Sequence, residues 1–307
     1  MVRKNLKTMM MALLMVSTAA YADENAKDTS FSAFAKSVGA GSVAGLVEVL
    51  VNQPQVYIKN GLQMDKTVAM LVEEVKKDPR VLYKGLPVGM ACMVPTMAAQ
   101  VGLNQALEQV MPGNDTATEV QRNALAGAAS AVLNNPAELV VVNQQKRKAR
   151  ALSTVKELYE RNGVQVAMRG LTPKAVRESL FCAGFLTAYP KAKELYAERN
   201  PDVQPWESTL AATAAVGPLT TVVTHPFDTL STQMQADPSK ATVRGWTDAF
   251  KSVMAQAEAK AAKEGAKKPS FLGALFAGLV PRTARVVVAI PLMSSVKEAV
   301  NKEMDKQ

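Results

Sequence analysis

The 307-residue sequence has little of the chemistry that enzymes and metal proteins use. It contains one histidine, His225, and two cysteines, Cys92 and Cys182, which stand far apart in the chain. These residues provide neither a Cys/His cluster with metal-ligand spacing nor a disulfide framework. We therefore predict no catalytic residue, no metal site and no cofactor, and we interpret both cysteines as free thiols.

Aromatic residues are also scarce, at 5% of the chain, whereas 48% of the residues are apolar and many are Ala, Val, Leu or Met. This composition favours helix over sheet and allows a large core. The formal net charge is +9, but the basic residues are spread along the chain and are not interleaved with aromatics as in a nucleic-acid site. Lipid head groups or anionic solutes suit this charge better, so no nucleic-acid partner is predicted.

No segment is an uninterrupted run of eighteen apolar residues, as an ordinary membrane span would be. Polar positions recur on one face of the long apolar stretches, which suits helices that border a water-filled cavity. We favour a membrane protein, with a soluble helical interaction protein as the alternative. The pattern predicts six long helices, near 31–62, 86–111, 119–150, 171–198, 206–236 and 276–303.

Residues 1–22 differ from the rest of the chain. Three basic residues near the N-terminus precede an apolar run from Met9 to Ala20, and Ala20-Tyr21-Ala22 has the form of a cleavage site. This order is typical of a bacterial secretory signal peptide. The alternative is an uncleaved apolar tail of the first helix.

Three prolines, Pro54, Pro136 and Pro226, divide the chain into a threefold internal repeat. Each has a glycine nine residues before it and a glutamine nine residues after it. The glycines are Gly45, Gly127 and Gly217, and the glutamines are Gln63, Gln145 and Gln235. The repeat is longer than a solenoid unit, so each unit is a small set of helices. Each proline is expected to kink its helix.

A second signature begins the next helix of every unit. It reads Tyr83-Lys84-Gly85, Met168-Arg169-Gly170 and Phe276-Ala277-Gly278. The repeats therefore span 31–111, 119–198 and 206–303, and the third contains an insertion. Much of the insertion is the Ala/Lys/Glu-rich tract 255–268, which we interpret as a solvated helix extension without a site.

These features resemble the mitochondrial carrier family, in which each of three repeats has Pro-x-Asp/Glu-x-x-Lys/Arg and then an aromatic-basic-Gly element. The third unit is closest, with Pro226-Phe227-Asp228 and with Pro281 to Arg285 after Gly278. The resemblance covers residues 31–303. It implies an all-α membrane protein in which six transmembrane helices form three pseudo-symmetric two-helix repeats around a central cavity. It also implies a monomeric solute exchanger of the mitochondrial inner membrane that works by alternating access.

In the family, the acid of one odd-numbered helix meets the base of the next and closes the cavity on the matrix side. The resemblance implies three such pairs here, Asp228 with Lys59, Glu138 with Ser231, and Val56 with Val141. Gln63, Gln145 and Gln235 stand where the family has glutamines that brace these pairs. One ion pair, one hydrogen bond and one apolar contact make a weak gate, since a half-solvated pair is worth about 1 kcal/mol or less.

The family's substrate contact points fall at Cys92-Met93, Arg177-Glu178 and Arg285-Val286, with Lys174 and Arg282 one turn away. Four cations against one acid predict a strongly positive centre that binds an anion. Phe181 stands where nucleotide-carrying members place an aromatic that stacks on adenine. We predict an adenine nucleotide, ATP or ADP, as the substrate. The alternative is an arginine- or ornithine-like amino acid, with its carboxylate on Arg177 and its amino group on Glu178.

The resemblance also implies membrane lipid as a partner, including anionic lipid such as cardiolipin. A bacterial-type leader on a carrier body gives the hypothesis of a gene from an intracellular bacterium whose product acts in host mitochondria. The bacterial envelope is the alternative location.

Overall fold

The computed structural model describes residues 28–64, 66–113, 115–264 and 270–304, and the predicted leader lies outside them. Its six long helices begin and end within three residues of the predicted bounds. They are α2 (Asp28–Gln63), α4 (Leu86–Val110), α5 (Thr116–Arg147), α7 (Leu171–Arg199), α8 (Pro205–Ala236) and α11 (Leu279–Met304). We call α2, α5 and α8 the proline helices and α4, α7 and α11 the return helices.

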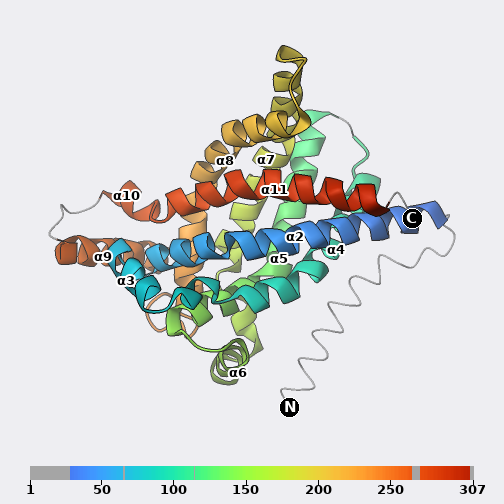
Figure 1. The fold of residues 1–307 in the computed structure, drawn as a ribbon. Helices are drawn as coiled ribbons and strands as arrows, with labels where there is room; N and C mark the ends of the chain where they lie inside the picture. The colour runs from blue at the N-terminus through green and yellow to red at the C-terminus, as the bar shows by residue number, and fades with distance from the viewer. Residues whose placement is uncertain (1–27, 65, 114, 265–269, 305–307) are drawn as a thin grey trace.

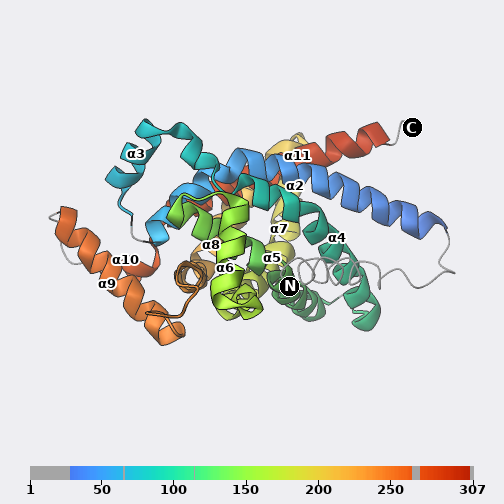
Figure 2. The same cartoon turned by 90° about the horizontal axis from the view of Figure 1, so that it is seen from below.

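The six long helices form a closed ring. Each packs against the next in chain order, and α11 packs against α2, beside which it lies in both views (Figures 1 and 2). The three proline helices also contact one another across the ring. Their C-terminal halves are the most buried parts of the bundle, so they converge where they end.

Short helices join the end of each proline helix to the start of the following return helix. In chain order they are α3 (Val68–Lys77) with η1 (Pro79–Tyr83), α6 (Ala151–Asn162) with η2 (Val164–Met168), and α9 (Trp246–Glu264) with α10 (Phe271–Leu275). We call this side of the bundle the short-helix end. The C-terminal end of α11 lies at the opposite end from α3 and α9 (Figures 1 and 2).

The residue before each repeat proline binds the turn that begins the following return helix. Each of the three side chains bonds the carbonyl oxygen just before the glycine of the second signature. The bonds join Gln53 Nε2 to Lys84 (2.7 Å), Asn135 Nδ2 to Arg169 (3.1 Å) and His225 Nε2 to Ala277 (3.0 Å). Buried carbonyls need such partners, so a threefold contact that the sequence analysis missed holds each repeat together.

The glycines of the second signature adopt the left-handed backbone that favours this residue, with φ of +98°, +76° and +83° at Gly85, Gly170 and Gly278. Each also packs against the proline helix of the next repeat. A Cβ at Gly85 would lie 2.7 Å from Val141 Cγ1, and one at Gly278 would lie 3.1 Å from the Lys59 carbonyl oxygen. A side chain at these positions would therefore separate neighbouring repeats.

The insertion of the third repeat does more than extend a solvated helix. It forms the later part of α9, where Lys260 Nζ donates to the carbonyl oxygen of Leu62 near the end of α2, at 2.7 Å. The side chains of Gln256 on α9 and Gln233 on α8 bond each other at 2.7 Å, and Gln233 also donates to the carbonyl of Gln63. The tract is therefore not simply a solvated extension, because α9 ties the third repeat to the first.

Within the described residues, two helical segments, Thr116–Arg147 and Leu279–Lys297, are long and apolar enough to cross a membrane by composition. The other long helices contain more polar side chains, and the proline helix α8 shows where these side chains lie. Thr221, Thr224 and Ser231 are almost completely buried inside the bundle. Polar residues on an inner face lower the average hydropathy of a helix without exposing charge on its outer face.

Candidate functional site

An ion pair between the first and third repeats lies where the proline helices converge. Lys59 Nζ is 2.9 Å from Asp228 Oδ2, and Gln63 Nε2 donates to the same oxygen at 2.8 Å. The predicted contact and its glutamine brace are therefore both present. The Lys59 and Asp228 side chains are only 8% and 1% exposed, so the pair is buried and not half-solvated. Breaking a buried pair costs about 3–5 kcal/mol, because one charge stays buried alone.

Asp228 is also the partner of two arginines from the return helices. Arg177 Nη1 of α7 donates to Asp228 Oδ1 at 2.5 Å, and Arg282 Nη1 of α11 lies 4.0 Å from Oδ2. Both arginines are predicted substrate contacts. The structure connects them to Asp228 as well.

Glu138 and Ser231 have partners other than each other. Ser231 Oγ donates to the Gly170 carbonyl at 3.0 Å. Glu138 forms an ion pair with Lys174 of α7 and lies 3.9 Å from Arg177 Nη1. Because α7 stands between α5 and α8 in the ring, its cations reach Glu138, which corrects the pairing that we predicted.

Gln145 and Gln235 brace different groups from those predicted. Gln145 accepts a hydrogen bond from Asn60 at 2.6 Å and donates to the Lys84 carbonyl at 2.9 Å. Gln235 donates to Asn135 Oδ1 at 2.9 Å. These glutamines join one repeat to the next through amides and carbonyls, so only Gln63 braces an ion pair.

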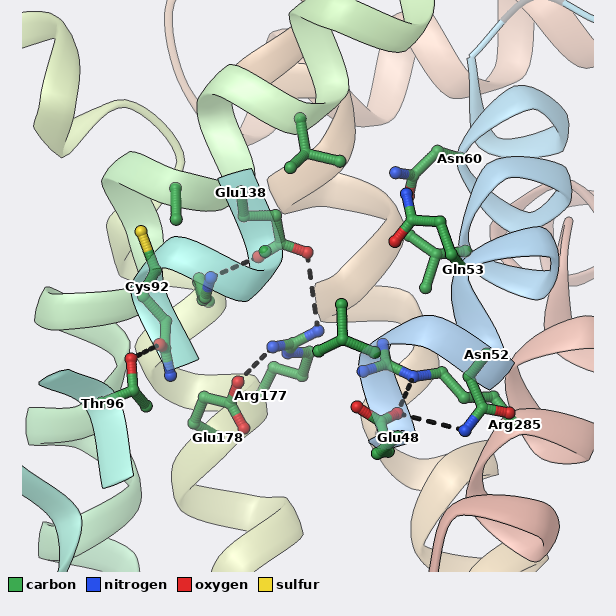
Figure 3. Close-up of a pocket in the computed structure, with 17 residues that line it drawn as sticks. Glu48, Asn52, Gln53, Asn60, Cys92, Thr96, Glu138, Arg177, Glu178 and Arg285 are labelled. Carbon is green, nitrogen blue, oxygen red and sulfur yellow. Dashed lines mark hydrogen bonds and ion pairs between the residues drawn. The ribbon is translucent and has the colours of Figure 1, made fainter. Parts of the chain in front are cut away.

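A cavity of about 270 Å³ opens beside Glu138, among α2, α4, α5, α7 and α11 (Figure 3). Val56 and Val141, the predicted apolar pair, both line it. Three acidic and three basic side chains face it. They are Glu48, Glu138, Glu178, Lys174, Arg177 and Arg285.

The balance of these charges corrects the prediction of a strongly positive centre. Glu48 of α2 is almost fully buried, and its Oε1 accepts from Arg285 Nε at 2.9 Å and from Asn52 Nδ2 at 3.3 Å. Glu48 and Asn52 are not among the residues predicted from the sequence. They precede Val56, a predicted gate position, at intervals of four residues. This spacing places them on the same helix face as Val56 and could have indicated that they line the cavity.

The other predicted contact residues do not all line the cavity. Cys92 lines the cavity, Arg282 does not, and the side chain of Met93 lies outside the described part of the chain. Arg282 instead donates to Thr224 Oγ1 at 2.8 Å. Phe181 is also absent from the lining of this cavity.

Phe181 belongs to an aromatic stack along α7. Its ring lies 5.3 Å from that of Phe185, centroid to centroid, and the ring of Phe185 lies 5.1 Å from that of Tyr189. Residues four apart share a helix face, so their aromatic rings can stack on one another. One face of the Phe181 ring is therefore already used in a contact within the helix.

Sequence comparison completes the assignment. A family model described as "Mitochondrial carrier protein" matches residues 119–200 and 202–307, which is more than half of the chain. The chain belongs to the mitochondrial carrier family. It is therefore a transporter and not an enzyme, and it is a multi-pass protein of the mitochondrial inner membrane. The matched residues contain the second and third repeats.

Several curated relatives resemble the carrier over most of its length. The mitochondrial citrate transporter C of Aspergillus niger is 27% identical, over 80% of this chain and 83% of the relative. The succinate/fumarate mitochondrial transporter of Saccharomyces cerevisiae is 26% identical, over 87% of this chain and 90% of the relative. An electrogenic aspartate/glutamate antiporter of Macaca fascicularis is 26% identical, over 75% of this chain but only 37% of that longer protein.

The names of these three relatives describe small anionic metabolites with at least two carboxylates. A calcium-dependent mitochondrial ATP-magnesium/phosphate carrier protein of Arabidopsis thaliana is 24% identical over 86% of this chain and 56% of that protein, so the names of the relatives differ in the substrate class that they describe.

Proposed function

We propose that this carrier exchanges an acidic amino acid across the mitochondrial inner membrane. The observation that carries the proposal is the cavity lining, which contains three acidic and three basic side chains. Two of the three basic side chains are arginines. A solute with two carboxylates and one ammonium group matches that lining.

The two arginines are suited to two carboxylates. Arg177 reaches the cavity from α7 and Arg285 from α11, and the Arg285 side chain is 41% exposed. A guanidinium presents a planar pair of donors that matches a carboxylate. The ends of a dicarboxylic amino acid can therefore be held by different repeats.

Competing solutes fit the same lining less well. A nucleotide would bring three or four negative charges beside Glu48, Glu138 and Glu178, and Phe181 is already stacked on Phe185. A basic amino acid has two cationic groups, and both would enter a cavity whose lining already contains three cations. A dicarboxylate without an amino group is the second candidate, which the names of the citrate and succinate/fumarate relatives favour.

The residues at the base of the cavity are our proposed gate. They are Lys59, Asp228, Glu138, Ser231, Val56, Val141 and the three glutamines, at the end of the bundle that we expect to face the matrix. The support is the buried Lys59–Asp228 pair, which joins α2 to α8. Opening the gate would separate these helices.

An anionic lipid is the second partner that we propose. A pocket of about 470 Å³ lies at the start of α7, and its lining includes Arg169, Lys240 and Arg244. A phosphate group near these cations and the N-terminal end of α7 would be favourably placed.

Exchange by the purified full-length carrier in liposomes tests the substrate. Aspartate or glutamate uptake should depend on internal amino acid, and ATP, ornithine and arginine should be poor substrates. We expect R177A and R285A to reduce uptake at least about tenfold, because each removes a charge-assisted carboxylate contact. C92S, a cavity variant without a charge change, is the matched control. Robust ATP/ADP exchange without amino-acid uptake would refute the proposal.

A further inference from the structure

We propose that the substrate's ammonium group is bound by Glu48 and Asn52 on α2, and not by Glu178 on α7. This inference rests on the proposed function and names the side chains that distinguish an amino acid from a plain dicarboxylate. Neither Glu48 nor Asn52 was a predicted contact residue.

The α2 wall contributes no basic side chain to the cavity lining, and Arg285 of α11 is the cation that pairs with its one acid. Glu48, Asn52, Val56 and Asn60 form one stripe at intervals of four residues, and all four line the cavity. Glu48 is the one charged side chain that α2 contributes to this lining. An ammonium group here would meet a carboxylate and amide oxygens.

The α7 wall has the opposite character. Lys174 and Arg177 line the cavity from α7 together with Glu178, and Glu178 is paired with Arg177. An ammonium group near Glu178 would be repelled by two neighbouring cations in a partly buried site, where charge interactions are stronger than in water. Figure 3 shows the two groups of side chains projecting from different helices.

Acceptor capacity remains on α2 after its internal bonds are counted. Asn52 Nδ2 and Arg285 Nε both donate to Oε1 of Glu48. Among the residues that the structure describes, Glu48 accepts hydrogen bonds through Oε1 and not through Oε2, and Asn52 Oδ1 is buried without a donor. Because a carboxylate accepts only, the Asn52 amide must present its nitrogen to Glu48, which fixes the unpartnered atom as oxygen.

The neighbouring arginine explains how both α-substituents of an amino acid could bind together. Glu48 engages Arg285 through Nε, so the terminal nitrogens of the guanidinium are not used in that contact. They can donate to a carboxylate while Glu48 accepts from the ammonium group beside it. The second carboxylate of the solute would then reach Arg177 across the cavity.

Aspartate and succinate provide the test, because they differ only by the amino group. Uptake of each is measured in liposomes containing the wild-type carrier, E48Q or E178Q, and the aspartate-to-succinate ratio of kcat/KM is compared. We expect E48Q to lower this ratio at least about tenfold, the loss of one charge-assisted bond. N52L should lower it less, and E178Q should leave it unchanged.

The ratio is an internal measurement, since both solutes are assayed on the same protein and any loss of folded carrier cancels. An unchanged ratio in E48Q, or a lowered ratio in E178Q alone, overturns the assignment of the ammonium site while leaving the substrate class intact. A wild-type carrier that exchanges neither solute refutes the proposed function, and the ammonium site falls with it.

Discussion

Arg177 of α7 donates to the carboxylate of Asp228 on α8 at 2.5 Å, and the same arginine lines the solute cavity. The candidate binding group and the candidate gate are therefore joined by one hydrogen bond. A solute carboxylate on Arg177 would compete with Asp228 for this donor. We expect an occupied cavity to weaken the contacts that hold α2, α7 and α8 together.

The Lys59–Asp228 pair should not tolerate an exchange of its charges. K59D combined with D228K would place a lysine at position 228, beside Arg177 and Arg282, which now surround a carboxylate. We expect the double variant to be less stable than K59M, by about 1–3 kcal/mol, because a buried charge loses its partners. Thermal unfolding in detergent measures this. The exposed Glu73–Lys77 pair, at 2.7 Å, is the matched control, and its swap should be nearly neutral. A swap at the gate that restores wild-type stability would contradict the shared role of Asp228.

Basic side chains bind the C-terminal carbonyls of each proline helix. Lys84 Nζ donates to the Lys148 carbonyl after α5 at 2.8 Å, and Arg169 Nε donates to the Asp237 carbonyl after α8 at 3.1 Å. The third repeat has Ala277 where the others have these cations, and Lys260 of the insertion supplies the contact to α2 instead. A cation at the C-terminus of a helix is favourable because the carbonyl dipoles point toward it.

K260M should therefore lower the unfolding temperature, by the equivalent of about 0.3–1 kcal/mol. Adding A277K should recover part of this loss, since it returns a lysine to the position used by the other repeats. K251M removes an exposed lysine from the same helix and should have no effect. Equal destabilisation by K260M and K251M would show that the contact to Leu62 contributes nothing.

Asn135 should be among the most sensitive amides in the bundle. Its Nδ2 donates to the carbonyls of Ala167 and Arg169 at 2.7 and 3.1 Å, and its Oδ1 accepts from Gln235. We expect N135L to destabilise the carrier by about 1–3 kcal/mol, because buried carbonyls lose their donor. N134L, which removes only the acceptor of Thr96, should cost less in the same detergent unfolding assay. Equal losses of stability in N135L and N134L would show that the bonds from Asn135 to the turn before α7 contribute nothing more than the Asn134 bond.

Glu74 predicts a dependence of stability on pH. Burial raises the pKa of this carboxyl, but hydrogen bonds from Lys66, Tyr57 and Lys148 outweigh burial and hold the pKa at about 2. A carboxyl with a lowered pKa stabilises the folded state above its unfolded pKa and loses that contribution as the pH falls. The difference in unfolding temperature between wild type and E74Q should therefore be full at pH 6 and shrink as the pH falls from about 4.5 toward 2. A constant difference across this window would show that the ion pairs do not stabilise the fold.

The sequence alone determined the threefold organisation. Three prolines in equivalent settings and three glycines after them located all six long helices, because helix periodicity and left-handed turns are local properties. The Lys59–Asp228 pair could also be predicted, because the resemblance to the carrier family implies that the acid of one proline helix meets the base of the next. Its burial could not, because exposure depends on how tightly the helices converge.

Only the tertiary structure decided which side chains meet. Glu138 pairs with Lys174 and not with Ser231, since α7 brings a cation between α5 and α8. Glu48 adds an acid to the cavity wall, and Phe181 is taken up by the stack with Phe185. A repeat in the sequence determines the order of the helices. The charge of the cavity is instead the sum over side chains from five helices, and the rotation of each helix about its own axis decides which side chains are included.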